Sequence, residues 1–320
     1  MNDRKIGRID VNMKRVFIDG SAGTTGLRIN ERLSERSDIE VVVLPDEIRK
    51  NADARRDALN SCDAAFLCLP DDAAREAVAM IENPDVTVID TSTAHRTLDG
   101  WAYGFPELSN EYRMNICSSK RIAVTGCHAS GFIALVYPLI EAGVLSKDAL
   151  LSCFSLTGYS GGGKKMIADY ENDERNKRLD APCQYGLTQT HKHLPEMKKI
   201  SGLSNEPIFC PIVADYYSGM EVTVPLFSEQ VSVGIDEIRD IYRGKYNGRV
   251  VKYFETMDEG GQLSANIMSG KDGMQITVSG NKDRILLVSR FDNLGKGASG
   301  AAIQCMNLSF GIDETTGLDL

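Results

Sequence analysis

The stretch RVFIDGSAGTTGLRINERLSER at residues 15–36 decides the fold. A short apolar run is followed at once by three glycines, Gly20, Gly23 and Gly26, and then by a polar segment of helical period. Small residues after a strand let the backbone turn tightly and approach a pyrophosphate, which the N–H groups at the start of the next helix stabilise. Glycine turns also follow strands for steric reasons alone, but the order of strand, loop and helix predicts nucleotide binding here.

The same alternation of apolar runs and helical segments continues to residue 126. The runs are short, β-branched and almost uninterrupted, as is typical of strands covered on both faces of a parallel sheet. They lie at residues 15–20, 39–45, 64–70, 86–90 and 121–126. Helical segments such as 27–36 and 71–83 lie between the first four. This layout predicts an α/β fold with a Rossmann-type doubly wound parallel sheet.

The pattern changes after Cys127. A helical segment at 131–143 is followed by longer strand-like runs, mostly without helices between them, which predicts a second α+β domain with a mainly antiparallel sheet. These runs lie at residues 149–156, 207–217, 220–227, 274–280 and 284–291. A helical stripe over residues 298–310 can pack back on the first domain. We therefore expect a dinucleotide-binding domain of residues 1–127 and 297–320 and a substrate domain of residues 128–296.

The composition restricts the classes of partner. The chain has 320 residues, enough for about two domains, and its net charge of -9 argues against nucleic acid, which needs a basic face. The N-terminal segment lacks the apolar core of a signal peptide, and the apolar run at 132–140 is far shorter than the ~20 residues that span a bilayer. We expect a cytoplasmic protein that acts on a small molecule and has no nucleic-acid or membrane partner.

Cys127 differs from the other seven cysteines in its position. The eight form no C-x-x-C pair and no Cys/His cluster at zinc-ligand spacing, so no metal is expected, and most should be buried free thiols. Cys127 stands at the end of a predicted strand, where open α/β sheets bind ligands, and before a helix whose N-terminus favours a thiolate. These placements suit a nucleophile, and a core cysteine is the alternative.

Four histidines are candidates for the accompanying base. His128 is a poor one, because neighbouring side chains point to opposite sides of a strand or diverge by about 100° on a helix. His191 and His193 can face one side of an extended segment, although a polar surface loop is the alternative. His95 follows the fourth predicted strand, but Arg96 beside it is the more useful group there, as a fixed cation for a carboxylate or phosphate.

The type of nucleotide stays open at this point. A ribose-binding acid is expected about 20 residues after the glycines, and Asp46 stands near there. Arg49 and Arg55 can instead meet a 2′-phosphate, so the residues alone do not separate NAD from NADP. Two further glycine-rich stretches, GYSGGGKK at 158–165 and DNLGKGASG at 292–300, are either flexible loops or places where the backbone approaches a flat or anionic ligand.

Six stretches together resemble the N-acetyl-gamma-glutamyl-phosphate reductase family of arginine biosynthesis, a relative of aspartate-semialdehyde dehydrogenase. They are GSAGTTG (20–26), YGFPEL (103–108), GCHASG (126–131), GYSGGGKK (158–165), HKHLPE (191–196) and the long, most specific DNLGKGASGAAIQCMNLSFGIDE (292–314). The resemblance covers nearly the whole chain. The length of the chain is that of the shorter of the two subtypes of this family, called type 2. The longer subtype has Asn-Pro-Gly-Cys-Tyr-Pro-Thr around its cysteine where this chain has Val-Thr-Gly-Cys-His-Ala-Ser, so roles of the cysteine's neighbours do not carry over directly.

The resemblance implies the site residues. Cys127 would be the nucleophile and His193 the acid/base, and we expect Arg96, His191 and Ser160 to contact the substrate. The cofactor would be NADP. It would be bound by the three glycine-rich loops, through Gly20, Ser21, Gly23, Thr24, Thr25, Gly26, Gly162, Gly163, Asn293, Lys296 and Gly297. The resemblance further implies a homodimer or homotetramer, with residues 128–296 serving catalysis and oligomerisation.

The implied reaction is the third step of arginine biosynthesis. The Cys127 thiolate would displace phosphate from N-acetyl-L-glutamyl 5-phosphate, and the enzyme thioester would be reduced by hydride from NADPH to the 5-semialdehyde, with His193 moving the proton. One rival is another acyl-phosphate reductase, such as aspartate-semialdehyde dehydrogenase or a carrier-linked reductase of lysine synthesis, because no residue visibly encodes the acetyl group. A more distant rival is a nucleotide-binding redox sensor, which has no need for Cys127 and His193.

Overall fold

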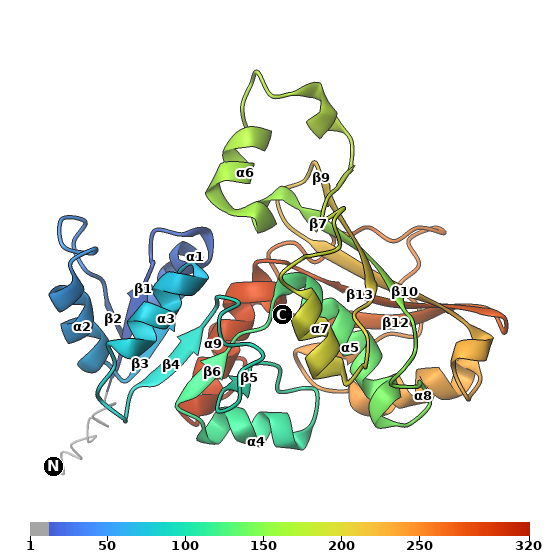
Figure 1. The fold of residues 1–320 in the computed structure, drawn as a ribbon, viewed down its shortest axis with the longest axis horizontal. Coiled ribbons are helices and arrows are strands. Elements are labelled where there is room, and N and C mark those ends of the chain that lie inside the picture. Colours follow the sequence, from blue (N-terminus) through green and yellow to red (C-terminus); the bar gives the residue numbers. More distant parts are fainter. Residues whose placement is uncertain (1–12) are drawn as a thin grey trace, which may run out of the picture.

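Two β-sheets organise the chain in the computed structural model, which describes residues 13–320 (Figure 1). Within these residues the first sheet has six parallel strands in the order β2-β1-β3-β4-β6-β5. The strands are β1 (Lys14–Asp19), β2 (Ile39–Val42), β3 (Ala64–Leu67), β4 (Thr87–Asp90), β5 (Ala102–Tyr103) and β6 (Arg121–Ala123). Their helices are α1 (Thr24–Ser34), α2 (Ala52–Asn60), α3 (Asp71–Ala79) and α4 (Asn110–Ser118). The predicted doubly wound parallel sheet is confirmed, and only the two-residue β5 is too short to be recognised from periodicity.

Helices cover both faces of this sheet. Alternate side chains of β1 point to opposite faces, so Val16 and Ile18 enter one core and Phe17 the other. The first core is shared with α1 and with the terminal helix α9 (Gly300–Ser309), and the second with α2 and α3. α9 packs against β4 and α4, although it is far from both in the sequence (Figure 1). The helical stripe at the end of the chain thus packs on the first sheet.

The second sheet is mixed and mainly antiparallel. Among the described residues it has seven strands in the order β11-β12-β13-β10-β7-β9-β8, and only the pairs β7–β9 and β11–β12 are parallel. The strands are β7 (Ser152–Gly158), β8 (Cys183–Gln184), β9 (Ile208–Ala214), β10 (Met220–Phe227), β11 (Val251–Tyr253), β12 (Met274–Gly280) and β13 (Arg284–Phe291). The second predicted sheet is therefore confirmed.

The helix α5 (Cys127–Glu141) is the centre of the second core. It packs against β10 and β13, and the helices α7 (Leu194–Ser201) and α8 (Ile235–Lys245) flank it. Sequence periodicity placed the start of this helix at residue 131, but the structure begins it at Cys127. This difference matters because it places Cys127 in the first helical turn.

The connection between β7 and β9 is long. It contains α6 (Gly163–Tyr170), the edge strand β8 and α7, and in Figure 1 α6 stands clear of both sheets at the top of the molecule. The returning chain carries Tyr185, His191 and His193 back toward the start of α5. No helix within residues 13–320 is both long and apolar enough to cross a lipid bilayer.

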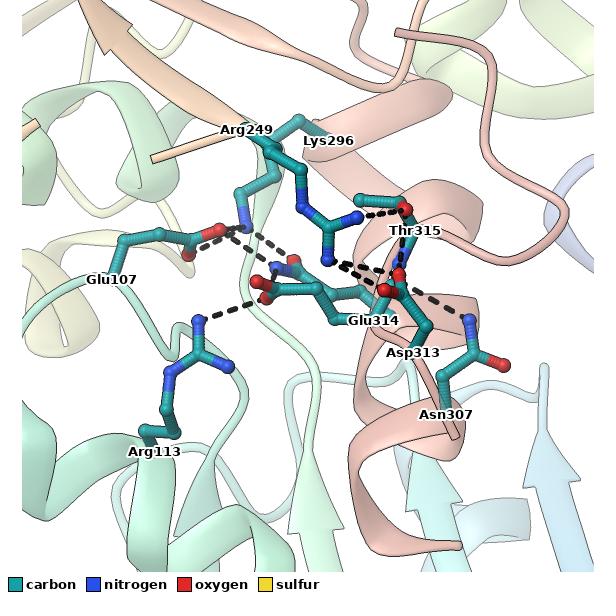
Figure 2. Close-up of polar contacts among 9 residues, drawn as sticks. Glu107, Arg113, Arg249, Lys296, Asn307, Asp313, Glu314 and Thr315 are labelled. Atoms are coloured by element: carbon teal, nitrogen blue, oxygen red, sulfur yellow. Dashed lines mark hydrogen bonds and ion pairs between the residues drawn. The ribbon is translucent and has the colours of Figure 1, made fainter. Parts of the chain in front are cut away.

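A buried ionic network holds the C-terminal segment in place (Figure 2). Lys296 lies in a π-helix (Gly295–Ser299), and its Nζ donates to both carboxylate oxygens of Glu107, at 2.9 and 2.7 Å, and to Oε1 of Gln304 at 2.6 Å. Gln304 Nε2 and Arg113 Nη2 each donate to Oε2 of Glu314 at 2.9 Å. The expectation that Lys296 binds the cofactor is not supported, because its ammonium is 2% exposed and fully engaged by these partners.

This network predicts a large cost for removing the buried cation alone. We expect Lys296→Met to lower the free energy of unfolding by about 3 kcal/mol, because Glu107 would keep a buried charge without a partner. The double variant Lys296→Met/Glu107→Gln should be less destabilised, since it removes that charge as well. Denaturant titration of the three proteins measures this, and a double variant less stable than Lys296→Met would contradict it.

Candidate active site

One cavity of about 410 Å³ collects most of the residues expected at the site. It is lined by the start of α1, the loop after β4, the start of α5, the loop after β7, the segment before α7 and the loop before α9. The expected residues found there are Thr24, Thr25, Arg96, Cys127, Ser160, Gly162, Gly163, His191, His193, Asn293 and Gly297. Elements of both sheets therefore contribute to a single cleft. Lys296 does not line it.

Cys127 occupies the first position of α5, after the N-cap Gly126. Its side chain is half-buried, and the wall beside it is Gly297, where an added Cβ would lie 2.9 Å from the Cys127 Cβ. Burial raises the pKa of the Cys127 thiol, while the positive charges of Arg96 and Lys192 and the backbone N–H of His128 lower that pKa. Burial is the larger effect, so the helix N-terminus does not by itself produce the thiolate expected from the sequence.

The carboxylate of Glu196 fixes the backbone in front of the cysteine. Its Oε1 accepts from the backbone N–H of Gly126 and from the Tyr103 hydroxyl, both at 2.8 Å, and its Oε2 accepts from Nη1 of Arg96 at 3.1 Å. All of these groups are buried. Sequence reasoning missed Glu196, because an acid in the first turn of a helix is ordinarily explained by the helix dipole.

Arg96 is held rigidly at the cavity wall. Its Nε donates to the carbonyl of Val124 at 2.8 Å and its Nη2 to the carbonyl of Thr91 at 2.9 Å, in addition to the Glu196 contact. The guanidinium is therefore oriented before any ligand arrives, and one carboxylate already balances its charge. Lys192, which sequence reasoning also missed, is the other cation that lines the cavity. It is exposed and forms no ion pair with the described residues.

The two histidines of the HKH stretch lie together in the cleft. Their ring centroids are 4.8 Å apart, and the backbone N–H of His193 donates to Nδ1 of His191 at 3.2 Å. Burial lowers the pKa of His191 to about 4. Burial, with the charge of Arg96 adding to it, lowers the pKa of His193 well below its ordinary value, so both rings are neutral at neutral pH. His193 Nδ1 has no hydrogen-bond partner among residues 13–320.

The ring of His193 lies against the start of the helix that carries Cys127. A Cβ built at Gly126, directly before Cys127, would lie 2.6 Å from His193 Nε2. The imidazole thus packs on the backbone that carries the thiol. A neutral, incompletely hydrogen-bonded histidine in this place is suited to exchanging a proton with a reacting group.

The remaining two histidines have other partners. His128 Nδ1 lies 2.7 Å from the Ser155 hydroxyl and its Nε2 2.7 Å from the Tyr185 hydroxyl, so both ring nitrogens are engaged. Burial lowers the pKa of His128 to about 3. His95 Nδ1 lies 2.6 Å from Asp90 Oδ2, and its ring stacks on Trp101 outside the cavity. Neither ring is arranged to act on Cys127.

The first glycine loop lies between this cleft and a second cavity of about 260 Å³. Gly20 and Ser21 line the second cavity, whereas Thr24 and Thr25 line the cleft. Gly20 has a φ of +86°, and a side chain there would collide with the carbonyl of Cys68. Glycine is therefore required by the fold of the loop, and the loop surface between the two cavities fits a dinucleotide that spans them.

The second cavity is basic. Arg49, Lys50 and Arg55 line it, and Arg55 Nη2 pairs with Asp19 at 2.8 Å. Asp46 is not part of its lining, and its side chain is 86% exposed and pairs with Arg49. The sequence left open whether Asp46 meets a ribose or Arg49 and Arg55 meet a 2′-phosphate. The two arginines line the cavity and Asp46 does not.

Comparisons with known proteins agree with this architecture. Residues 15–115 match the family model described as semialdehyde dehydrogenase, NAD binding domain, and residues 127–293 match semialdehyde dehydrogenase, dimerisation domain. The aspartate semialdehyde dehydrogenase II of Vibrio cholerae has a similar structure, with a TM-score of 0.70 and 16% identity over 93% of this chain and 98% of that one. At this identity the likeness shows the fold.

Relatives of higher identity show the family. N-acetyl-gamma-glutamyl-phosphate reductase of Rhizobium meliloti (strain 1021) is 44% identical over 92% of this chain and 98% of its own length. N-acetyl-gamma-glutamyl-phosphate reductase 2 of Nostoc sp. (strain PCC 7120) is 42% identical over 96% of this chain and 100% of its own. The chain therefore belongs to the N-acetyl-gamma-glutamyl-phosphate reductase family, within the semialdehyde dehydrogenase fold.

Proposed function

We propose that the chain reduces N-acetyl-L-glutamyl 5-phosphate to N-acetyl-L-glutamate 5-semialdehyde and phosphate, with NADPH as reductant. The proposal rests on one observation: Cys127, the neutral His193 and two cationic side chains line the same cleft, beside a glycine loop that fits a dinucleotide. The cations are Arg96 and Lys192. The names of the relatives at 42–44% identity support the substrate. A redox sensor would not need this set of side chains.

The proposed chemistry begins at Cys127. The neutral His193 accepts the thiol proton, and the charge of the anionic substrate favours the resulting imidazolium. The thiolate sulfur forms a bond to the acyl carbon as the carbon–oxygen bond to phosphate breaks, giving a thioester and free phosphate. A bound nicotinamide cofactor would supply a hydride to the acyl carbon of this thioester. His193 then returns its proton as the carbon–sulfur bond breaks and the aldehyde leaves.

Arg96 and Lys192 have different roles in this proposal. Arg96 is immobilised by three hydrogen bonds and neutralised by Glu196, which suits it to orienting one substrate oxygen. Lys192 forms no ion pair with residues 13–320, so its charge is suited to the phosphate that must enter or leave. We propose Ser160 and His191 as further substrate contacts, because both line the same cleft.

The basic second cavity supports NADP in preference to NAD. Lys50 can neutralise a 2′-phosphate there, and so can Arg49, whose partner Asp46 is largely exposed, whereas Arg55 is paired with the buried Asp19. We propose that Gly20, Ser21, Gly23, Thr24, Thr25 and Gly26 hold the pyrophosphate side of the cofactor. Gly162, Gly163, Asn293 and Gly297 would hold its nicotinamide side.

The same proposal divides the chain into two domains and includes its assembly into a homo-oligomer. Residues 1–127 and 297–320 would form the cofactor domain, with 1–12 outside the described residues, and 128–296 the catalytic and oligomerisation domain. The face of the second sheet away from α5 carries Phe154, Pro225 and Leu286, of which Phe154 is 43% exposed. We propose this face as the homodimer or homotetramer contact.

The eight free cysteines support a reducing location, the cytoplasm.

The main test is the oxidation of N-acetyl-L-glutamate 5-semialdehyde, with and without phosphate. The reduction of NADP or NAD measures the reaction rate. We expect turnover that requires phosphate and prefers NADP. Cys127→Ala should abolish turnover and His193→Ala should lower kcat about 10²- to 10⁴-fold, because they remove the nucleophile and the proton carrier. Cys117→Ala, at an exposed position outside the cleft, is the matched control. Turnover of aspartate semialdehyde instead would favour the rival acyl-phosphate reductase.

Lys192→Met tests the phosphate contact in the same assay. We expect the KM for phosphate to rise about tenfold with little change in kcat, because a charge-assisted contact of this kind contributes ~1.5–3 kcal/mol. Lys199→Met is the control, since Lys199 is an exposed lysine of the following helix α7 that pairs with Asp99 at 3.1 Å. An unchanged KM for phosphate would show that Lys192 does not bind it.

Sedimentation velocity tests the proposed interface. The wild-type chain should sediment as a dimer or tetramer, and Phe154→Glu should shift it toward the monomer, because a charge would be buried in the contact. Met114→Glu, at an exposed position of α4, should leave the oligomer intact. A wild-type monomer at micromolar concentration would rule the interface out.

A further inference from the structure

We propose that the Tyr185 hydroxyl, held in position by His128, recognises the N-acetyl amide of the substrate. This inference rests on the proposed function, and it names the residue that would separate an acetylated substrate from one without the acetamido group. Tyr185 lines the same cleft as Cys127 and His193. Neither its side chain nor that of His128 has a role in the chemistry described above.

The phenol is fixed from two sides. The backbone N–H of Tyr185 donates to the carbonyl of Pro211 at 3.0 Å, which ties this residue to strand β9. The hydroxyl lies 2.7 Å from His128 Nε2, and the other ring nitrogen of His128 lies 2.7 Å from the buried Ser155 hydroxyl on β7. A continuous relay therefore runs from the sheet to the cleft, and the phenol is its last member.

The relay is uncharged at neutral pH. Burial raises the pKa of the Tyr185 phenol, which keeps its proton, and His128 is neutral because burial lowers its pKa to about 3. A neutral relay leaves one hydrogen-bonding position of the phenol open in either tautomer of His128. If the phenol donates to Nε2, its oxygen can accept from the cleft; if Nε2–H donates to the phenol, the hydroxyl proton can be donated into the cleft.

An amide is the substrate group that matches such a partner. The substrate has two anionic groups, the acyl phosphate and the α-carboxylate, and one neutral polar group, the acetamide. Arg96 and Lys192 supply the positive charge in the cleft for the anions. The acetamide offers both an N–H donor and a C=O acceptor, so it can pair with the phenol in either state of the relay.

The test compares two aldehydes that differ only in the acetamido group. These are N-acetyl-L-glutamate 5-semialdehyde and 5-oxopentanoate, each oxidised with phosphate and NADP by the full chain. We expect Tyr185→Phe to lower kcat/KM for the first about tenfold, mainly through KM, and to change kcat/KM for the second less than twofold. Tyr216→Phe is the matched control, because the Tyr216 hydroxyl is also buried but has no hydrogen-bond partner within residues 13–320 and lies outside the cleft.

The outcomes separate this inference from the proposed function. An equal loss on both aldehydes, or no loss on the acetylated one, would overturn the role of Tyr185 while the function stands. Activity on 5-oxopentanoate also shows that the variant is folded, so misfolding cannot imitate a selective loss. A wild-type chain that oxidises neither aldehyde would remove the proposed function, and the inference with it.

Discussion

A single buried carboxylate, that of Glu196, connects the parts of the active site. It receives hydrogen bonds from Tyr103 on β5, from Arg96 after β4 and from the backbone of Gly126 at the start of α5. Because α7 carries Glu196 and belongs to the core of the second sheet, the carboxylate links that core to the edge of the first. The relative position of Arg96, Cys127 and His193 depends on this link.

The electrostatic design of the cleft follows from how each charge is compensated. Arg96 is compensated by Glu196 within the protein, whereas Lys192 forms no ion pair with residues 13–320. The histidines are kept neutral by burial, which makes His193 able to accept a proton and leaves His128 as a neutral hydrogen-bond partner. The raised pKa of the Cys127 thiol means that the proposed role of this residue as a nucleophile requires a base to take its proton.

Sequence periodicity was sufficient for the other strands of both sheets, because strand and helix periods are local properties of the chain, but the two- and three-residue strands β5, β8 and β11 were not recognised. It was insufficient where a role depends on packing between distant segments. Lys296 stands in a glycine-rich motif and reads as a cofactor contact, but Glu107 and Gln304 engage its ammonium in a buried network. Lys192 is the opposite case, because an exposed lysine between two histidines is not recognisable as a site residue from the sequence. Only the structure shows that it lines the cleft.

The sequence by itself determined the alternation of strands and helices, the glycine loop that must follow β1, and a cysteine at the junction of a strand and a helix. These depend on neighbours within a few residues, where side-chain size and period dictate the backbone. Only the tertiary structure decided which histidine ring lies beside Gly126, which cleft cation forms no ion pair with residues 13–320 and which tyrosine lines the cleft. Those facts depend on contacts such as Gly126 with Glu196 and His128 with Tyr185, which form between segments that are brought together when the two sheets pack.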